Sequence, residues 1–182
     1  METYRIAVLI GSLRKESLNR KLAEAIYCQA PSSLTFDEAS ISELPLYNQD
    51  YDDNQADTVK LFKSQISNAD ALLFVTPEYN HSVPGVLKNA IDHASRPYGE
   101  SAWTGKAAGI LGISPSPTGT CMSQMHLRSI MAALSVSIMP QPDMFLQDKS
   151  FFGSSNMPQG DKRELLQKWV DSYVEWIKCQ VK

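Results

Sequence analysis

Residues 6–20 read IAVLIGSLRKESLNR, and this stretch is the most informative about the fold. Its apolar run ends at Gly11, a polar loop follows, and Leu18, Leu22 and Ile26 then share one face of a predicted helix. The first N–H groups of such a helix lack backbone partners and carry the positive end of the helix dipole. The stretch therefore predicts a strand–loop–helix unit that is able to bind an anion.

The side chains of this loop fit a phosphate. Ser12 and Ser17 offer hydroxyl donors, Asn19 offers an amide, and Arg14 offers a guanidinium that holds two phosphate oxygens. The alternative is that Ser12 or Ser17 only caps the helix. The loop lacks the Gly-Lys-Ser/Thr ending of an NTPase loop and the later glycines of the dinucleotide fingerprint, which favours a monophosphate.

Composition narrows the class of protein. The chain has 182 residues, 43% hydrophobic and 20% charged, and we expect one domain over residues 1–182. Its net charge of −3 and scattered basic residues do not predict nucleic acid as a partner. The first apolar run is too short for a signal peptide, and no run approaches a membrane span, so we expect no membrane insertion and a cytoplasmic protein.

The three cysteines fit a reducing compartment. Cys28, Cys121 and Cys179 are widely spaced and form no Cys-x-x-Cys motif, so we expect neither a disulfide nor a metal site. Cys28 and Cys179 fall within predicted helices, where we expect them to pack as small side chains, and Cys121 begins a helix.

Strands and helices alternate along the chain. The predicted strands are Arg5–Ile10, Leu34–Glu38, Ala71–Thr76, Ala107–Ser114 and a fifth from Ser137 through Met144 to Leu146. The predicted helices are Leu18–Gln29 and four patterns marked by Val59, Phe62, Ile66 and Ala69; Leu87, Ile91 and Ala94; Met122, Met125, Ile130 and Leu134; and Leu165, Leu166, Trp169, Val170, Tyr173, Val174 and Ile177. This alternation predicts a doubly wound α/β fold, with a five-stranded parallel sheet and helices on both faces.

Polar, turn-rich loops follow three of the strands. In the strand order 2-1-3-4-5, ligands bind beyond the carboxyl ends of strands one and three. The loops at residues 11–17, 76–85 and 114–119 all fall at that edge, which makes it the predicted site. Residues 40–54 form a long acidic excursion, either a surface loop or a lip over the site. Residues 96–105 carry Tyr98 and Trp103, which either cover the core or contact another subunit.

Two long motifs and two shorter ones carry a family resemblance. They are the Gly-Ser-Leu-Arg-x-x-Ser-x-Asn loop from Gly11, the run Pro-Glu-Tyr-Asn-x-Ser-x-Pro-Gly-x-Leu-Lys-Asn-x-Ile-Asp from Pro77 to Asp92, Leu-Pro-Leu-Tyr at 44–47, and Gln-x-His-Leu-Arg at 124–128. Through them the chain resembles the NAD(P)H-dependent FMN reductase family, which includes bacterial quinone, chromate and azo-dye reductases. The resemblance implies a flavodoxin-like fold.

The resemblance also implies which residues hold the cofactor. It assigns Ser12, Arg14, Ser17 and Asn19 to the FMN phosphate, with Leu18 beside them. It places Pro77, Glu78, Tyr79 and Asn80 along the isoalloxazine ring, and Ser114 near the ring or the ribityl chain. The third loop departs from the family's glycine-rich pattern, because it carries Pro115 and Pro117. No catalytic side chain is implied, since the flavin N5 atom accepts the hydride.

The function implied is an oxidoreductase with ping-pong kinetics. NADPH or NADH reduces FMN, and a quinone, free flavin, azo or nitro aromatic or chromate-type acceptor then takes the electrons. The resemblance further implies a homodimer or homotetramer. One alternative is a flavodoxin-like electron carrier without its own NAD(P)H oxidation, although such carriers usually have a pronounced acidic field. A second is a phosphate-binding module without redox use.

Overall fold

The computed structural model describes residues 2–147, 151–152 and 157–181, and within them the strand order is β2-β1-β3-β4-β5, with all pairs parallel. The strands are β1 (Tyr4–Ile10), β2 (Leu34–Glu38), β3 (Ala71–Val75), β4 (Ala107–Ser114), β5 (Ser137–Ile138) and β6 (Phe145–Gln147). The helices are α1 (Leu18–Gln29), η1 (Gln49–Asn54, a 3₁₀ helix), α2 (Asp57–Ser67), α3 (Gly85–Ala94), α4 (Cys121–Ala133) and α6 (Asp161–Gln180). The predicted fold class and strand order are confirmed.

The fifth predicted strand is interrupted in the structure. β5 pairs with the start of β4, β6 pairs with its end, and residues 139–144 between them make no ladder. Pro140 and Pro142 stand in this gap. Because proline has no N–H to donate to a ladder, the prediction of one continuous strand from Ser137 to Leu146 is wrong.

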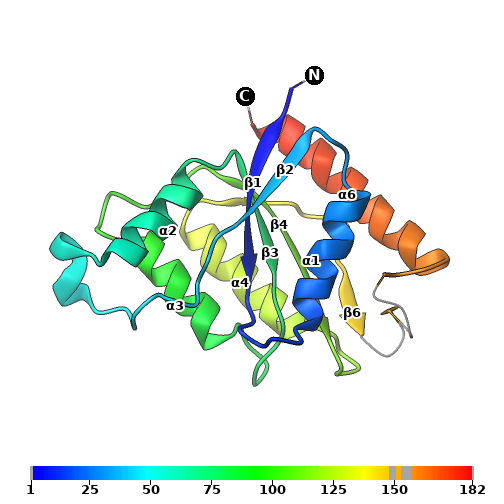
Figure 1. Cartoon of the computed structure of the whole chain (residues 1–182), viewed down its shortest axis with the longest axis horizontal. Helices are drawn as coiled ribbons and strands as arrows, with labels where there is room; N and C mark the ends of the chain where they lie inside the picture. Colours follow the sequence, from blue (N-terminus) through cyan, green and yellow to red (C-terminus); the bar gives the residue numbers. More distant parts are fainter. Residues whose placement is uncertain (1, 148–150, 153–156, 182) are drawn as a thin grey trace.

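The sheet has helices on both faces, as Figure 1 shows. Alternate residues of β1 face opposite sides: Ile6 and Val8 pack in the core under α1 and α6, whereas Ala7 and Leu9 pack in the core under α2, α3 and α4. All four are almost completely buried. A strand buried on both sides is what a doubly wound parallel sheet requires.

α6 packs very closely against β4 on one face of the sheet. A Cβ at Gly109 would lie 2.8 Å from the Tyr173 ring and 2.9 Å from the Trp169 ring, so only glycine lets these two aromatic rings lie on the strand. The Tyr173 hydroxyl donates to the Leu72 carbonyl over 2.7 Å. Burial raises the pKa of this phenol well above its usual value, so it remains a donor.

The aromatic segment at 96–105 divides between core and surface. Trp103 is fully buried and donates to the Ile91 carbonyl, whereas Tyr98 is 90% exposed.

Cys28 and Cys179 are exposed, so the expectation that they pack is wrong, because both fall on the solvent-facing sides of their helices. Among the described helices, none combines the length and apolarity that crossing a membrane would require.

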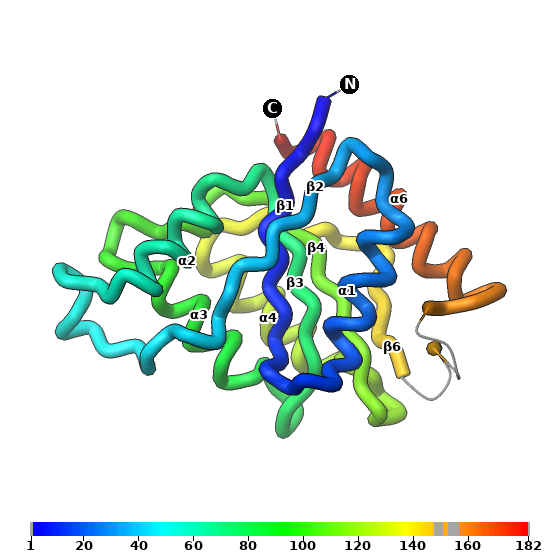
Figure 2. The backbone as a smooth tube through the Cα atoms, in the orientation of Figure 1, coloured from blue at the N-terminus to red at the C-terminus, as the bar shows by residue number. Residues whose placement is uncertain are grey.

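The three polar loops gather at one edge of the sheet. Figure 1 shows the loops after β1, β3 and β4 at the lower edge, below the ends of the strands. Figure 2 shows both chain termini at the opposite edge, and it shows the excursion at 40–56 projecting sideways beyond α2. The carboxyl edge of the sheet is therefore free of the chain ends and carries the candidate site.

Candidate functional site

A cavity of about 190 Å³ lies at this edge, and we call it the loop-edge cavity. It lies among the loop after β1, the start of α1, the loop after β3 and the end of β4. Its lining residues are Ser12, Arg14, Ser17, Leu18, Asn19, Pro77, Glu78, Tyr79, Ile113, Ser114 and Pro115. Nine of the ten residues predicted for the site line it, and Asn80 is the one that does not.

The β1 loop presents anion-binding groups to the cavity. The Ser17 hydroxyl accepts a hydrogen bond from the Arg20 N–H over 3.3 Å, so Ser17 caps α1, and its own hydroxyl proton stays available for a ligand. Ser12 is 95% buried, and its hydroxyl oxygen lies 3.4 Å from the Arg14 N–H. In the described part of the chain, the Arg14 guanidinium makes no ion pair, so it is free for an anion.

Asn19 has a second role that the sequence does not reveal. Its amide nitrogen donates to the Ile113 carbonyl over 3.0 Å, and its amide oxygen accepts from the Ile113 N–H over 3.1 Å. The side chain, 97% buried, thus pins the first turn of α1 to the end of β4. Two walls of the cavity are held together by this residue, and its assignment to the phosphate remains a prediction.

The loop after β3 is a tight hairpin. Tyr79 and Ser82 exchange two backbone hydrogen bonds of 3.1 and 3.0 Å. Asn80 and His81 between them have φ angles of 51° and 58°, as in a type I′ turn. Asparagine tolerates this left-handed conformation, which explains the residue type at position 80. Asn80 therefore shapes the hairpin, while Tyr79, 43% exposed, lies at the rim of the cavity.

Glu78 ties this hairpin to α4. One carboxylate oxygen accepts from the Ser123 N–H over 3.0 Å, in the first turn of α4, where the helix N-cap makes no side-chain hydrogen bond. The other lies 3.6 Å from Nδ1 of His81, and only 7% of the Glu78 side chain is exposed. A carboxylate at a helix N-terminus satisfies an orphan N–H and complements the helix dipole. The Ser82 hydroxyl adds a 3.0 Å contact to Nδ1 of His126, so α4 supports both ends of the hairpin.

The third loop contributes only its beginning. Ser114 and Pro115 line the cavity, whereas Ser116, Thr118 and Gly119 do not. The Ser116 hydroxyl lies 3.0 Å from the Thr118 hydroxyl, and the Gly119 N–H donates to the Ser116 carbonyl. The proline-containing loop thus folds back on itself.

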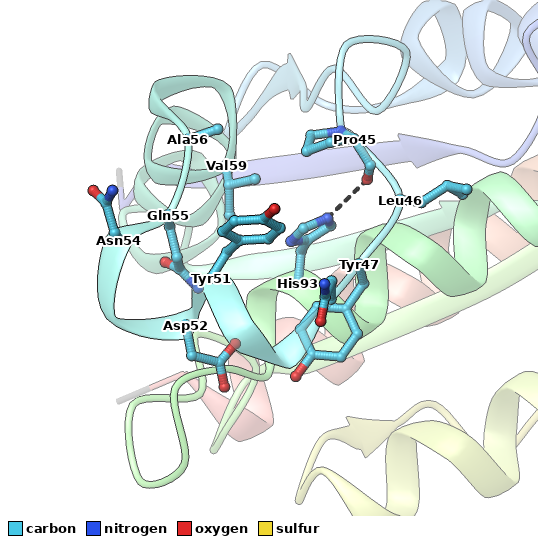
Figure 3. A pocket seen from close by; sticks show the side chains of 11 residues that line it. Pro45, Leu46, Tyr47, Tyr51, Asp52, Asn54, Gln55, Ala56, Val59 and His93 are labelled. Carbon is cyan, nitrogen blue, oxygen red and sulfur yellow. Dashed lines mark hydrogen bonds between the residues drawn. The ribbon is translucent and has the colours of Figure 1, made fainter.

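The excursion at residues 40–54 does not line the loop-edge cavity. Its first residues, together with Glu38 and Ala39, line a cavity of about 230 Å³ on the β2 side of the β1 loop, which we call the β2-side cavity. A third cavity of about 270 Å³ is lined by residues 45–48, 51–52 and 54–56 together with Val59 and His93. Figure 3 shows the His93 imidazole near the Tyr47 ring, whose centroid is 5.4 Å away, with its hydrogen bond to the Pro45 carbonyl over 2.9 Å.

Polar contacts hold the excursion to α3 and to Arg96, which follows the end of that helix. The Tyr47 N–H donates to the Asn89 amide oxygen over 2.8 Å, and Arg96 forms a 2.7 Å ion pair with Asp52. Gln55 donates to the Arg96 carbonyl. The third cavity shares no lining residue with the loop-edge cavity, so these residues enclose a separate cavity.

Ser123 and His126 support the site, and neither was predicted from the sequence to belong to it. They lie on α4, and they touch the hairpin only because β3 and β4 are neighbours in the sheet. The Gln-x-His-Leu-Arg motif at 124–128 was the one signal that pointed to this helix.

The residues present fit a ligand with a phosphate at one end and a flat polar ring at the other. The β1 loop supplies a free guanidinium and hydroxyl donors, and the hairpin supplies an aromatic side chain. In the described residues, the N–H groups of Glu78 and Asn80 have no hydrogen-bond partner, so they are free to donate. This donor set matches FMN.

Known proteins resemble this chain over its length. The sequence model of the NADPH-dependent FMN reductase family matches residues 4–149. A 2-hydroxy-1,4-benzoquinone reductase from a Burkholderia species is 46% identical over 176 residues, which cover 96% of each protein.

Solved structures agree with this similarity. FerB, a flavoenzyme NAD(P)H:(acceptor) oxidoreductase from Paracoccus denitrificans, superposes with a TM-score of 0.92 at 37% identity, covering 98% of this chain and 99% of FerB. A WrbA-like flavodoxin from Agrobacterium tumefaciens superposes with a TM-score of 0.61 at 17% identity, covering 98% and 99% of the two chains, which shows a flavodoxin-like fold.

Proposed function

This chain belongs to the NADPH-dependent FMN reductase family, and we propose that the loop-edge cavity is its FMN site and that a quinone is its electron acceptor. The chain is an NAD(P)H-dependent oxidoreductase that uses FMN. When bound, FMN supplies the redox chemistry by taking a hydride from NAD(P)H and passing electrons to the acceptor. The observation that carries the site proposal is the meeting of phosphate donors and an aromatic hairpin in one cavity.

The β1 loop binds the phosphate in this proposal. Arg14 provides two parallel donors, Ser12 and Ser17 provide hydroxyls, and Leu18 lies beside them at the start of α1. The start of α1 adds the positive end of its dipole. Asn19 holds the loop against Ile113 and so fixes where these donors converge.

The hairpin orients the ring. The free N–H group of Glu78 donates to its polar edge, and Pro77 and Tyr79 flank it, while Asn80 forms the turn that holds these residues in place. The Glu78 carboxylate faces α4, so it acts on the ring only through the position of the hairpin. Ser114 lies at the opposite wall.

Quinone is the acceptor class favoured by the relatives, because the Burkholderia protein is named for a benzoquinone. A flat aromatic acceptor also suits the rim of the cavity, where the apolar ring of Tyr79 is 43% exposed. A second subunit that covers this apolar rim would exclude water, so we extend the proposal to a homodimer or homotetramer.

We also propose one domain over residues 1–182 and a cytoplasmic location. Two core clusters on the two faces of a single sheet support the first. Three free cysteines support the second.

The test is a visible absorption spectrum of the protein after incubation with FMN and desalting, followed anaerobically during additions of NADPH or NADH and then of a benzoquinone. The proposal predicts a bound-flavin band that bleaches with pyridine nucleotide and returns with the quinone. A band that binds but does not bleach would indicate an electron carrier. No bound band would contradict the FMN site.

A further inference from the structure

The β2-side cavity adjoins the loop-edge cavity across the β1 loop. Ser12 and Arg14 line both cavities. The walls of the β2-side cavity are Ile10, Ser12, Leu13, Arg14, Lys15 and Arg20 on one side and Glu38, Ala39, Ser40, Ile41 and Ser42 on the other. A ligand that passes along the outer side of an FMN phosphate would therefore enter it.

Positive charge predominates in this cavity. Three cations, Arg14, Lys15 and Arg20, line it with one carboxylate, that of Glu38. Arg20 is neutralised by Glu38 through two contacts of 2.6 and 2.7 Å. Arg14 and Lys15 make no ion pair with any residue that the structure describes. Because the proposed function assigns Arg14 to the FMN phosphate, Lys15 is the unpaired cation that remains for a second anionic group in this cavity.

The far wall adds hydroxyl groups. The hydroxyls of Ser40 and Ser42 lie 3.2 Å apart, and both residues are exposed at the cavity. The Ser42 hydroxyl also lies 3.5 Å from the Glu43 carboxylate, at the limit of a hydrogen bond. Hydroxyls opposite a lysine and an arginine are a donor set for phosphate.

The environment of the Glu38 carboxylate, at the end of β2, does not favour binding of the adenosine ribose of NADH, which has two free hydroxyls. In dinucleotide-binding α/β folds, a carboxylate near this position binds the ribose hydroxyls of NAD, whereas a nearby cation accommodates the extra phosphate of NADP. Here both oxygens of Glu38 are held by the Arg20 guanidinium. The acceptors that would select NADH are occupied, and the cation that would select NADPH is free.

We propose that the β2-side cavity binds the 2′-phosphate of NADPH and that Lys15 is the residue that distinguishes NADPH from NADH. This inference rests on the proposed function, because it takes the FMN phosphate to lie in the neighbouring cavity. NADPH is longer than FMN, and the proposal takes its adenosine end to run past the FMN phosphate when its nicotinamide lies against the flavin ring. Arg14 is engaged there, and Lys15 supplies the additional point charge.

Steady-state kinetics with both nucleotides test the inference. We expect Lys15→Gln to raise the ratio of KM for NADPH to KM for NADH about tenfold, the loss of one charge-assisted contact. Lys15→Arg keeps the charge and should keep the ratio. Lys21→Gln removes a lysine of α1 that does not line the cavity, and it should leave the ratio unchanged. An unchanged ratio in Lys15→Gln would overturn the inference.

Equilibrium binding gives a readout that is independent of turnover. Isothermal titration of the FMN-loaded protein should show tighter binding of adenosine 2′,5′-bisphosphate than of 5′-AMP, and Lys15→Gln should abolish the difference. Equal binding of the two probes to the unsubstituted protein would contradict the inference. Failure of the proposed function looks different, because neither NADH nor NADPH would then bleach the flavin.

Discussion

The loop after β1 and the loop after β3 meet at one cavity, but the chain uses their side chains in opposite ways. In the β1 loop, Arg14 is exposed and unpaired among the described residues. In the β3 loop, the Glu78 side chain is 93% buried and hydrogen-bonded to α4, and the hairpin is closed by two backbone hydrogen bonds. One loop offers side chains to a ligand, and the other offers a fixed backbone.

This difference suits the two ends of FMN. A phosphate is a strong anion, so a few charged and hydroxyl donors recognise it. A flavin ring needs its polar edge and its electron affinity set by donors at fixed positions. A braced hairpin provides these with little reorganisation. Substitutions in the β1 loop should therefore change phosphate affinity, and substitutions around the β3 loop should change the scaffold first.

The largest effect should come from Gly112→Ala, which disturbs the packing of β4 against Thr76, just after β3, and Thr120, just before α4. A Cβ at Gly112 would overlap the Thr76 carbonyl oxygen and the Thr120 hydroxyl. We expect a loss of about 3 kcal/mol in the free energy of unfolding, because neither neighbour can move without shifting β3 or α4. Urea denaturation followed by circular dichroism measures it.

Gly85→Ala is the matched control, because a Cβ there meets nothing within 4 Å. It begins α3, and alanine should leave stability unchanged or raise it by about 0.5 kcal/mol. Equal stability losses in the two variants would contradict the account of the scaffold.

Arg14→Ala should give the next largest effect, confined to the ligand. FMN affinity should fall by about 2 kcal/mol, roughly 30-fold, because a charge-assisted phosphate contact is lost. Stability of the apoprotein should not change. Fluorescence titration of FMN measures the affinity, with Arg163→Ala on the exposed start of α6 as the control.

Glu78→Ala should mainly lower the stability of the protein rather than its affinity for FMN. It leaves the Ser123 N–H without its acceptor, and we expect a loss of about 1.5 kcal/mol in unfolding free energy. Glu78→Gln keeps an amide oxygen for this contact and should recover most of the loss. Thermal unfolding of both variants measures these stabilities. An alanine variant as stable as the parent would show that Glu78 does not support the hairpin.

Asn80→Ala should have the smallest effect. Its φ of 51° costs an alanine about 1 kcal/mol, whereas glycine adopts it freely. The alanine variant should bind FMN several-fold more weakly, and Asn80→Gly should bind it as the parent does. Equally weak binding in both would instead assign a direct role to the Asn80 side chain.

The sequence predicted the edge of the sheet where the site lies, because parallel strands bring their following loops together. That reasoning placed Ser12 and Tyr79 at one cavity across more than sixty residues of chain. The same reasoning could not predict side-chain contacts between one element and another. Nothing local in the sequence signals that Asn19 binds Ile113 or that Glu78 caps α4.

The same limit applies to the fifth strand and to the cysteines. Pro140 and Pro142 were visible in the sequence, but where the ladder resumes depends on where β4 ends. Cys28 and Cys179 lie on helices whose apolar periodicity was correct, and their exposure follows from which side of each helix faces the sheet.

Comparison of FMN with riboflavin tests the division between the two loops most directly. Both flavins carry the same ring, and only FMN carries the phosphate. Affinities of the parent and of Arg14→Ala for each flavin form a thermodynamic cycle. The account predicts that Arg14→Ala weakens FMN binding roughly 30-fold and leaves riboflavin binding unchanged. An equal loss for both flavins would contradict it, because Arg14 would then act on the ring or on the fold.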